Sequence, residues 1–397
     1  MKLAIVSPYP PEVSGVAHYG ARLAAGFART GRFAQLRVFA NALPGAPPAE
    51  DRDGLAVRRV WRRDHLGAAW VTLRALLQWQ PDLAFFNLGL TTFGSTRPAN
   101  FMGLAAPMLA RRLGLPTVVT LHEVFETADL RALGAVNGRL THWGGQAATA
   151  MLLQANTVCL TLQTYRLLIR LKYGARNVAH VPLGAFEPPR FSPLPAEKRI
   201  MILAKYAPHK GLPELIAMFR RMRQADPAVT LTVAGSDHAR FPGYVAGVQA
   251  ATGELAGLDW RVDVLDEELP ALFASARVVA MPATAAAGAS SVVQRAAAGG
   301  RPMVAYDLPE LRAVAAEERL RIDFVPQGFS ELFAERLAHW LNHTDEAEMV
   351  GRANVAAMQS LTVDQICWRY ISIFEQVVSR WGVGSSQLEV GRSNLEF

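Results

Sequence analysis

The chain has 397 residues, of which 51% are hydrophobic and 19% are charged, with 31 glycines and 24 prolines. This length predicts two domains, and the composition excludes a disulfide miniprotein and a disordered chain. The two cysteines, Cys159 and Cys367, stand in apolar segments without a CxxC motif or clustered histidines, so neither a disulfide framework nor a zinc site is expected. No signal peptide or membrane-spanning segment is expected either.

Charge is distributed unevenly along the chain. Residues 1–185 carry 20 basic and 9 acidic residues, a net charge of +11, whereas residues 186–397 carry 21 and 25, a net charge of −4. The excess predicts an anionic partner for the first half, such as a membrane surface or a phosphorylated substrate, with a solvated basic surface as the alternative. The densest clusters are Arg58, Arg59, Arg62, Arg63, Arg111 and Arg112. We expect a cytoplasmic protein with weak contact at the inner face of an anionic membrane, and no nucleic-acid partner.

Short apolar runs alternate with longer amphipathic stretches along the whole chain. Runs without period-2 alternation suit strands buried on both faces of a parallel sheet. In the first half these are residues 3–7, 36–40, 83–87, 117–121 and 157–161. In the second half they are residues 199–204, 230–235, 261–265, 277–281 and 302–306. The pattern predicts an α/β protein with two Rossmann-like, doubly wound domains.

A proline-rich segment separates the two halves. Residues 182–198 contain five prolines and cannot continue a helix or a central strand, so they predict an interdomain linker. The N-terminal domain is then expected at residues 1–185 and the C-terminal domain at 186–362. Residues 363–381 predict an amphipathic closing helix that packs back toward the first domain, followed by a frayed tail at 382–397.

Two segments of the first half could carry chemistry. Residues 7–28 place a Pro/Gly loop between the first strand and a helix, and Gly15 would let an anion approach the N–H groups at the helix start. The loop lacks both GxGxxG and the lysine of a P-loop, which disfavours nicotinamide-binding and kinase interpretations. His122 and Glu123 follow the strand at 117–121, at the sheet edge where open α/β domains bind ligands, although a structural role is equally compatible.

Two segments of the second half could bind a phosphate. Lys205 and Lys210 follow the strand at 199–204 and could hold a diphosphate by charge; two solvated lysines are the alternative. Ser290 and Ser291 begin a predicted helix, where they could cap the helix and also leave N–H groups for an anion.

Taken in this order, these segments resemble the retaining glycosyltransferases of family 4, whose GT-B architecture has two Rossmann-like domains facing a crevice. The resemblance extends from SPYPPEVSGVAHY near the amino terminus to AAGGRPMVAYD and the closing helix. It implies that Lys205 and Lys210 correspond to the Arg and Lys that grip the donor diphosphate, where Lys for Arg keeps the charge but loses the bidentate fork.

The resemblance also implies roles for the other segments. His122 would lie beside the reacting sugar as the catalytic histidine. Gly15, in the first loop, would lie near the donor phosphate and the acceptor. Backbone amides at Ser290 and Ser291 would meet the β-phosphate of the donor.

One departure from the family pattern affects the donor site. The family's two glutamates, eight positions apart, fall at Ala287 and Arg295, so both carboxylates are absent. Recognition of the donor sugar or nucleotide would then come from Gly288, Arg295, Asp307 and Glu310. An unmade charged hydrogen bond costs about 1–3 kcal/mol, which is compatible with a working enzyme.

The implied function is transfer of a sugar, with retention, from a nucleoside-diphosphate sugar to a glycan, lipid-linked or small-molecule acceptor. UDP or GDP would be the donor nucleotide, and no metal or other cofactor is expected because no DxD-type acidic pair stands at the end of any of the ten predicted strands. The missing glutamates favour an alternative, a catalytically silent GT-B subunit that binds a glycan or a homologous partner. A sugar-nucleotide epimerase is disfavoured because its additional acidic and histidine residues have no counterpart here.

Overall fold

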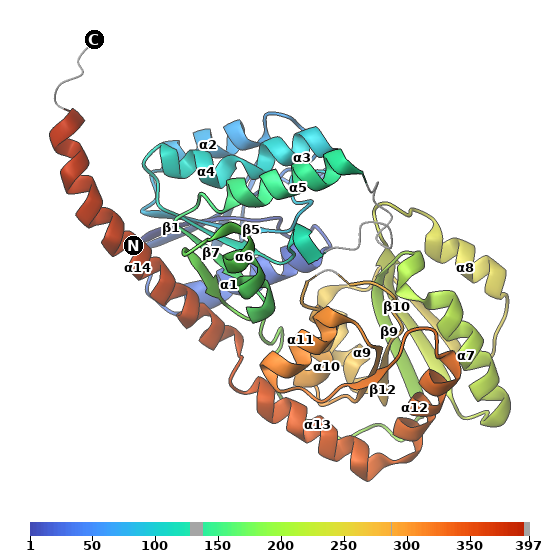
Figure 1. The fold of residues 1–397 in the computed structure, drawn as a ribbon. Coiled ribbons are helices and arrows are strands. Elements are labelled where there is room, and N and C mark those ends of the chain that lie inside the picture. The colour runs from blue at the N-terminus through green and yellow to red at the C-terminus, as the bar shows by residue number, and fades with distance from the viewer. Residues whose placement is uncertain (128–137, 287, 393–397) are drawn as a thin grey trace. The chain divides into compact units, whose positions relative to one another are not determined.

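The structure, a computed structural model, describes residues 1–127, 138–286 and 288–392. The chain forms two compact units (Figure 1). The N-terminal unit contains residues 1–127, 138–182 and the chain from Val363, and the C-terminal unit contains residues 183–362. The division at Pro182 and Leu183 lies three residues before the expected domain end at 185.

The N-terminal unit is built on an eight-stranded sheet of order β3-β4-β2-β1-β5-β6-β7-β8. Its strands are β1 (Lys2–Val6), β2 (Gln35–Asn41), β3 (Ala49–Arg52), β4 (Leu55–Trp61), β5 (Leu83–Leu88), β6 (Thr117–Leu121), β7 (Thr157–Leu160) and β8 (Val178–His180). Its helices before the closing helix are α1 (Gly15–Arg29), α2 (Ala68–Trp79), α3 (Arg97–Leu104), α4 (Ala106–Arg112), α5 (Arg139–Leu152) and α6 (Gln163–Tyr173), with a short 3₁₀ turn at Phe125–Thr127. All strand pairs are parallel except β3 with β4.

The five strands expected in the first half are β1, β2, β5, β6 and β7, and their buried faces explain their continuous apolar runs. Every residue of β5 is buried, and Ile5 of β1 pairs in register with Val38 on one side and Phe85 on the other. The sequence pattern missed β4 because its residues alternate between buried and exposed, and β3 because it is a polar edge strand.

The C-terminal unit is built on a six-stranded parallel sheet of order β11-β10-β9-β12-β13-β14. Its strands are β9 (Arg199–Tyr206), β10 (Thr230–Asp237), β11 (Leu258–Val262), β12 (Val278–Met281), β13 (Met303–Tyr306) and β14 (Asp323–Val325). Its helices are α7 (Leu212–Ala225), α8 (Tyr244–Thr252), α9 (Leu269–Ser275), α10 (Ser291–Ala298), α11 (Pro309–Glu318), α12 (Ser330–Asn342) and α13 (Thr344–Met358), with 3₁₀ turns at Pro208–Lys210 and Asp266–Glu268. Two doubly wound α/β units are therefore confirmed. The strand expected at 261–265 instead begins at Leu258, and the three-residue β14 was not predicted.

The closing helix α14 (Val363–Arg392) belongs to the N-terminal unit and contacts α1. Its Tyr370 and Phe374 rings lie 6.2 and 5.5 Å from the ring of Phe27 on α1, and 5.1 and 5.3 Å from that of Phe85 on β5. The helix continues to Arg392 and does not end at 381, which corrects the expected tail. Gly382 and Gly384 cost only about 1 kcal/mol each in a helix, and the segment contains no proline that would stop it.

The expected linker is anchored to the C-terminal unit. The Arg301 side chain is fully buried, and its guanidinium donates to the carbonyls of Ser192, Pro193 and Ala276. Burial lowers the pKa of Arg301 to about 10, so it stays charged at neutral pH. A single buried guanidinium thus holds the proline-rich segment in place. It donates hydrogen bonds to backbone carbonyls of that segment that are not paired in a sheet.

Candidate active site

In each unit the order of strands reverses direction next to a central strand, which in open α/β sheets marks the ligand-binding edge. In the N-terminal unit this switch lies between β1 and β5, and in the C-terminal unit between β9 and β12. The predicted site residues follow these strands. Each unit therefore carries its own set of functional groups.

His122 stands at the carboxyl end of β6, where a short chain of hydrogen bonds orients its ring. Its Nε2 lies 2.6 Å from Oδ1 of Asn87, whose Nδ2 donates to the Val16 carbonyl and to Ser7 Oγ, each at 2.9 Å. Because the carbonyl only accepts, the amide nitrogen must face it, so Oδ1 faces His122 and accepts from Nε2–H. Nδ1 then holds the lone pair. Burial lowers the pKa of His122 to about 4, so the ring is neutral at pH 7.

Aromatic packing completes the setting of His122. The Tyr19 ring on α1 contacts the imidazole edge-on, with centroids 4.9 Å apart. The Tyr19 hydroxyl lies 3.3 Å from that of Tyr370, which also accepts from Thr120. Such a fixed, neutral imidazole can accept a hydrogen bond from a substrate hydroxyl or receive a proton at Nδ1.

The first two turns of α1 pass very close to this network. A Cβ added at Gly20 would clash with Ser7 Oγ and touch Asn87 Nδ2, so only glycine allows the helix to lie there. Gly15 is exposed at the helix start, where an added Cβ would meet nothing within 4 Å. Ser14 caps the helix by accepting from the Ala17 N–H at 3.1 Å. Whether Gly15 contacts a phosphate stays a prediction.

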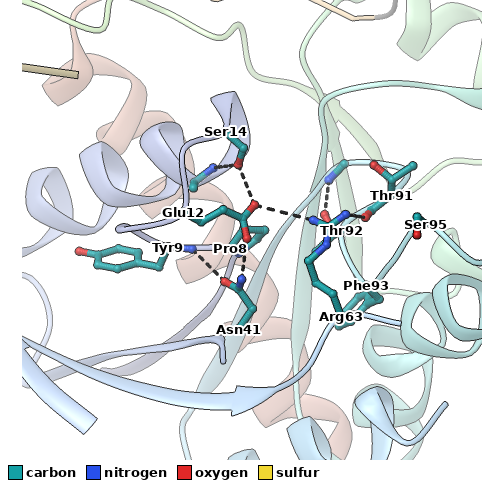
Figure 2. A network of polar contacts seen from close by, with 12 residues as sticks. Pro8, Tyr9, Glu12, Ser14, Asn41, Arg63, Thr91, Thr92, Phe93 and Ser95 are labelled. Carbon is teal, nitrogen blue, oxygen red and sulfur yellow. Dashed lines mark hydrogen bonds and ion pairs between the residues drawn. The ribbon is translucent and has the colours of Figure 1, made fainter. Parts of the chain in front are cut away.

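A second polar network lies at the carboxyl ends of β1 and β2 (Figure 2). Glu12 Oε1 accepts from Ser14 Oγ at 3.0 Å and lies 3.8 Å from the Arg63 guanidinium, while Oε2 accepts from Asn41 Nδ2 at 2.5 Å. Arg63 also donates to the Thr91 carbonyl at 3.1 Å. A partly exposed carboxylate and guanidinium are therefore held side by side at the sheet edge.

The sequence interpretation missed Asn87, Glu12 and Asn41. Asn87 and Asn41 each stand at or near the carboxyl end of an apolar strand, and both are fully buried. A buried amide in that position must have hydrogen-bond partners, so a polar residue ending an apolar run was the available signal. No feature of the sequence around Glu12 indicates that it belongs to a site.

The C-terminal unit gathers cations at the carboxyl ends of β9 and β10. Lys205 Nζ donates to Ser236 Oγ on the neighbouring strand. Lys210 ends the 3₁₀ turn that follows β9. Burial, Arg240, Lys210 and Lys205 together lower the pKa of His238, which places both lysines near its ring. Burial, helped by Lys210 and His238, lowers the pKa of His209 to about 4.

With lowered pKa values the rings of His209 and His238 are neutral at pH 7, so the positive charges here are those of Lys205, Lys210 and Arg240. An anion bound among these three side chains would be stabilised by all of them. Both predicted lysines therefore lie in one electropositive cluster, to which the structure adds His238 and Arg240. The sequence interpretation missed His238, although it directly follows the carboxyl end of β10.

The loop before α10 contains the predicted amide donors. Gly288 has a φ of 79°, a conformation that favours glycine, and Ser290 is the residue preceding the helix. Ser290 makes no side-chain capping bond, so the capping role that was the alternative is not observed. Ser291 is the first helical residue. Ala287 lies outside the described residues.

The predicted donor contacts Arg295, Asp307 and Glu310 have different surroundings. Arg295 is buried, with ion pairs to Glu187 and Asp266 and its guanidinium 4.7 Å from the centre of the Phe186 ring. Its charge is thus compensated within the unit, and a contact with the donor stays a prediction.

Asp307 forms a two-point ion pair with Arg312, at 2.7 and 2.9 Å, which lowers the pKa of the carboxyl group. Glu310 stands in the first turn of α11, where burial raises its pKa. Contacts of these two carboxyl groups with a donor also stay predictions.

Comparison with known families agrees with this arrangement. Residues 14–184 match the model of the glycosyl transferase 4-like domain, and residues 197–343 match that of the glycosyl transferases group 1. Together the two ranges span most of the chain. The chain belongs to the group 1 glycosyltransferases. This glycosyltransferase has the GT-B fold, as the resemblance implied.

Solved structures support the same fold. The sucrose-phosphate synthase from Thermosynechococcus elongatus matches with a TM-score of 0.76 and 16% identity over 96% of this chain and 100% of that chain. Anabaena Alr3699/HepE in complex with UDP-glucose matches with a TM-score of 0.68 and 16% identity over 95% and 100%. A UDP-forming α,α-trehalose-phosphate synthase from Burkholderia xenovorans matches with a TM-score of 0.67 and 14% identity over 95% and 99%. A search of curated protein sequences finds no match.

The described residues contain no group of three or more His, Cys, Asp or Glu side chains that could hold a metal ion. Cys159 and Cys367 are both buried and unpaired by disulfides. Among the described residues no helix is long and apolar enough to span a membrane.

Proposed function

We propose that this glycosyltransferase takes a nucleoside-diphosphate sugar as donor and binds its diphosphate at the cation cluster of the C-terminal unit. The observation that carries the proposal is the placement of Lys205, Lys210 and His238 at the carboxyl ends of β9 and β10, where burial and neighbouring positive charges lower the pKa values of His209 and His238. A diphosphate bound here would place its negative charge beside these cations. UDP is the first candidate nucleotide because HepE binds UDP-glucose, and GDP is the second.

Departure of the diphosphate needs charge stabilisation, which the two lysines and the N–H groups at Ser290 and Ser291 would provide. In this proposal no metal ion is required. Retention of configuration is part of the proposal and is supported by the family 4 resemblance and by a trehalose-6-phosphate synthase in which transfer with retention was analysed.

His122 would position a reacting hydroxyl through Nδ1, because Asn87 holds the Nε2 proton. Glu12 and Arg63 would contact hydroxyl groups of an acceptor, since a carboxylate accepts and a guanidinium donates. A glycan, a lipid-linked glycan or a hydroxylated small molecule meets this description. We also propose a cytoplasmic location, supported by the free thiols of Cys159 and Cys367, and an anionic membrane surface as partner of the N-terminal unit.

The second candidate function is a silent GT-B subunit, and one observation favours it. Arg295 stands where the family has a glutamate, and its guanidinium is bound by Glu187 and Asp266. Such a subunit would bind a glycan or a homologous partner without turning over a donor.

Titration calorimetry with UDP and GDP, followed by hydrolysis assays over a panel of UDP- and GDP-sugars, tests the proposal. We expect nucleotide binding and slow donor hydrolysis. Nucleotide binding without hydrolysis or transfer, together with stimulation of a co-expressed homologue, would support the silent subunit. No binding of either nucleotide would refute the donor site.

A further inference from the structure

One face of the N-terminal sheet is covered by helices without a single acidic residue. The path β4, β5, β6, β7 advances in one direction across the sheet, so right-handed crossovers put α2, α3, α4 and α5 on one face. These helices contact one another and form one layer in Figure 1. Residues 65–81, 83–122 and 138–186 contain no Asp or Glu. The layer's basic residues are Arg74, Arg97, Arg111, Arg112 and Arg139.

The same helices expose large apolar side chains. Trp70 on α2 is 67% exposed, and Leu140 and Trp143 on α5 are 83% and 74% exposed. Phe101 and Met102 on α3 are exposed as well. Solvent-facing tryptophans on several adjacent helices are unusual on a soluble surface and mark an interaction site.

Aromatic and basic residues are paired by helical spacing. Trp70 and Arg74, Arg97 and Phe101, and Arg139 and Trp143 are each four residues apart, and all six are exposed. Residues four apart are neighbours on one side of a helix. Three helices of the layer thus each present an aromatic ring beside a guanidinium.

From this pattern we infer that the α2–α5 layer, defined by these four helices, is a docking face for an anionic lipid bilayer. The inference rests on the proposed function and deepens it by naming the face that contacts the membrane. Arginines attract anionic headgroups, while tryptophan, phenylalanine and leucine side chains bury in the interfacial region. The four helices themselves contain no acidic residue that would repel an anionic surface, and the nearby Asp64 carboxylate is bound to the N–H groups of Ser95 and Thr96 at the start of α3.

Two alternatives fit the layer less well. A second copy packed face to face would oppose arginine to arginine with no carboxylate in the layer to pair them. The other candidate surface, the arginine cluster around β4, is only partly available for membrane contact. Arg59 is buried, with an ion pair to Glu50, and Arg63 is bound to Glu12 and Thr91. Arg58 and Arg62 of the same cluster are exposed, so membrane contact through this cluster stays a prediction.

Flotation of the full chain with phosphatidylcholine vesicles, with and without phosphatidylglycerol, tests the docking face. We expect binding only to the vesicles that contain phosphatidylglycerol, weakened by salt. Arg74→Glu with Arg139→Glu should lower the partition coefficient by at least about tenfold, since each basic residue near such a surface contributes about 1 kcal/mol. Trp70→Ser with Trp143→Ser should lower it by about tenfold through lost apolar burial.

Matched controls lie on α14, which packs against α1. Trp368→Ser and Arg380→Glu remove an exposed tryptophan and reverse an exposed arginine, and each should change partitioning by less than about twofold. The inference is wrong if the wild-type chain does not bind these vesicles or if the α14 variants lose as much binding. It is also wrong if light scattering shows a dimer that the Trp70/Trp143 variant dissociates.

Donor hydrolysis measured without vesicles separates this inference from the proposed function. If wild-type protein hydrolyses a donor but ignores vesicles, only the docking face is refuted. If it binds vesicles through the layer but neither binds nor hydrolyses any donor, only the proposed donor chemistry is refuted.

Discussion

The two units place different chemistry at equivalent edges of their sheets. In the N-terminal unit the polar groups satisfy one another: His122 is neutral and bound to Asn87, and Glu12 is bound by Ser14 and Asn41. In the C-terminal unit positive charges gather, because Lys205, Lys210 and Arg240 lie near His238 and, with burial, lower its pKa. The first edge is organised without a ligand, whereas an anionic ligand would stabilise the second, as proposed above. Mutations at the N-terminal edge should therefore mainly affect turnover, and mutations at the C-terminal edge should mainly affect nucleotide binding.

The largest expected effect is that of His122→Ala. We expect turnover to fall by about 10²-fold or more, while nucleotide affinity stays within roughly threefold, because the imidazole acts mainly in the transition state. Steady-state kinetics measures the turnover, and titration calorimetry measures the nucleotide affinity. His65→Ala, at an exposed histidine of the same unit, is the control. A large loss of nucleotide affinity in His122→Ala would contradict the assignment of turnover to the N-terminal edge and of nucleotide binding to the C-terminal edge.

In contrast to His122→Ala, Lys210→Ala should mainly lower the affinity for the nucleotide. We expect nucleoside-diphosphate binding to weaken by about 1.5–3 kcal/mol, the scale of a lost charge-assisted contact. Titration calorimetry measures this change. Lys198→Ala is the control, because its Nζ is bound to Asp226 at 2.6 Å near the amino end of β9. Equal affinities in wild type and Lys210→Ala would refute the phosphate site.

A smaller effect is expected on stability as pH falls. The folded-state pKa of His122 is about 4, below its ordinary value of 6.5, so between these values the unfolded chain binds more protons. Lowering the pH from 7 to 5 should therefore cost about 2 kcal/mol of unfolding free energy through His122. Urea unfolding at both pH values measures it, and His122→Gln should reduce the dependence. An identical dependence in the variant would show that the ring is not kept neutral by burial.

The smallest expected effect is that of metal removal. Treatment with EDTA should leave donor hydrolysis unchanged, because the lysines and helix N–H groups carry the diphosphate charge in the proposed mechanism. Activity before and after dialysis against EDTA measures this. A strict requirement for added manganese would contradict the proposal and assign the charge stabilisation to a metal.

The sequence predicted most of the fold because buried parallel strands leave a local signal. Ten apolar runs correspond to ten of the fourteen strands, and β3, β4, β8 and β14 escaped because they are short or half exposed. His122, Lys205 and Lys210 could be selected because each follows such a run, and in a parallel sheet all carboxyl ends meet at one edge.

The contacts that complete the two sites could not be predicted in this way. Arg295 binds Asp266 and Glu187, which lie 29 and 108 positions away, and Asn87 and Ser7 are 80 positions apart. The absence of acidic residues from the α2–α5 layer is visible in the sequence, but the exposure of Trp70 and Trp143 is not. By itself the sequence determined the strand pattern and the residues at strand ends, because period and spacing are local properties. Only the tertiary structure decided which side chains meet and which face water, because those depend on crossovers that join residues far apart in the chain.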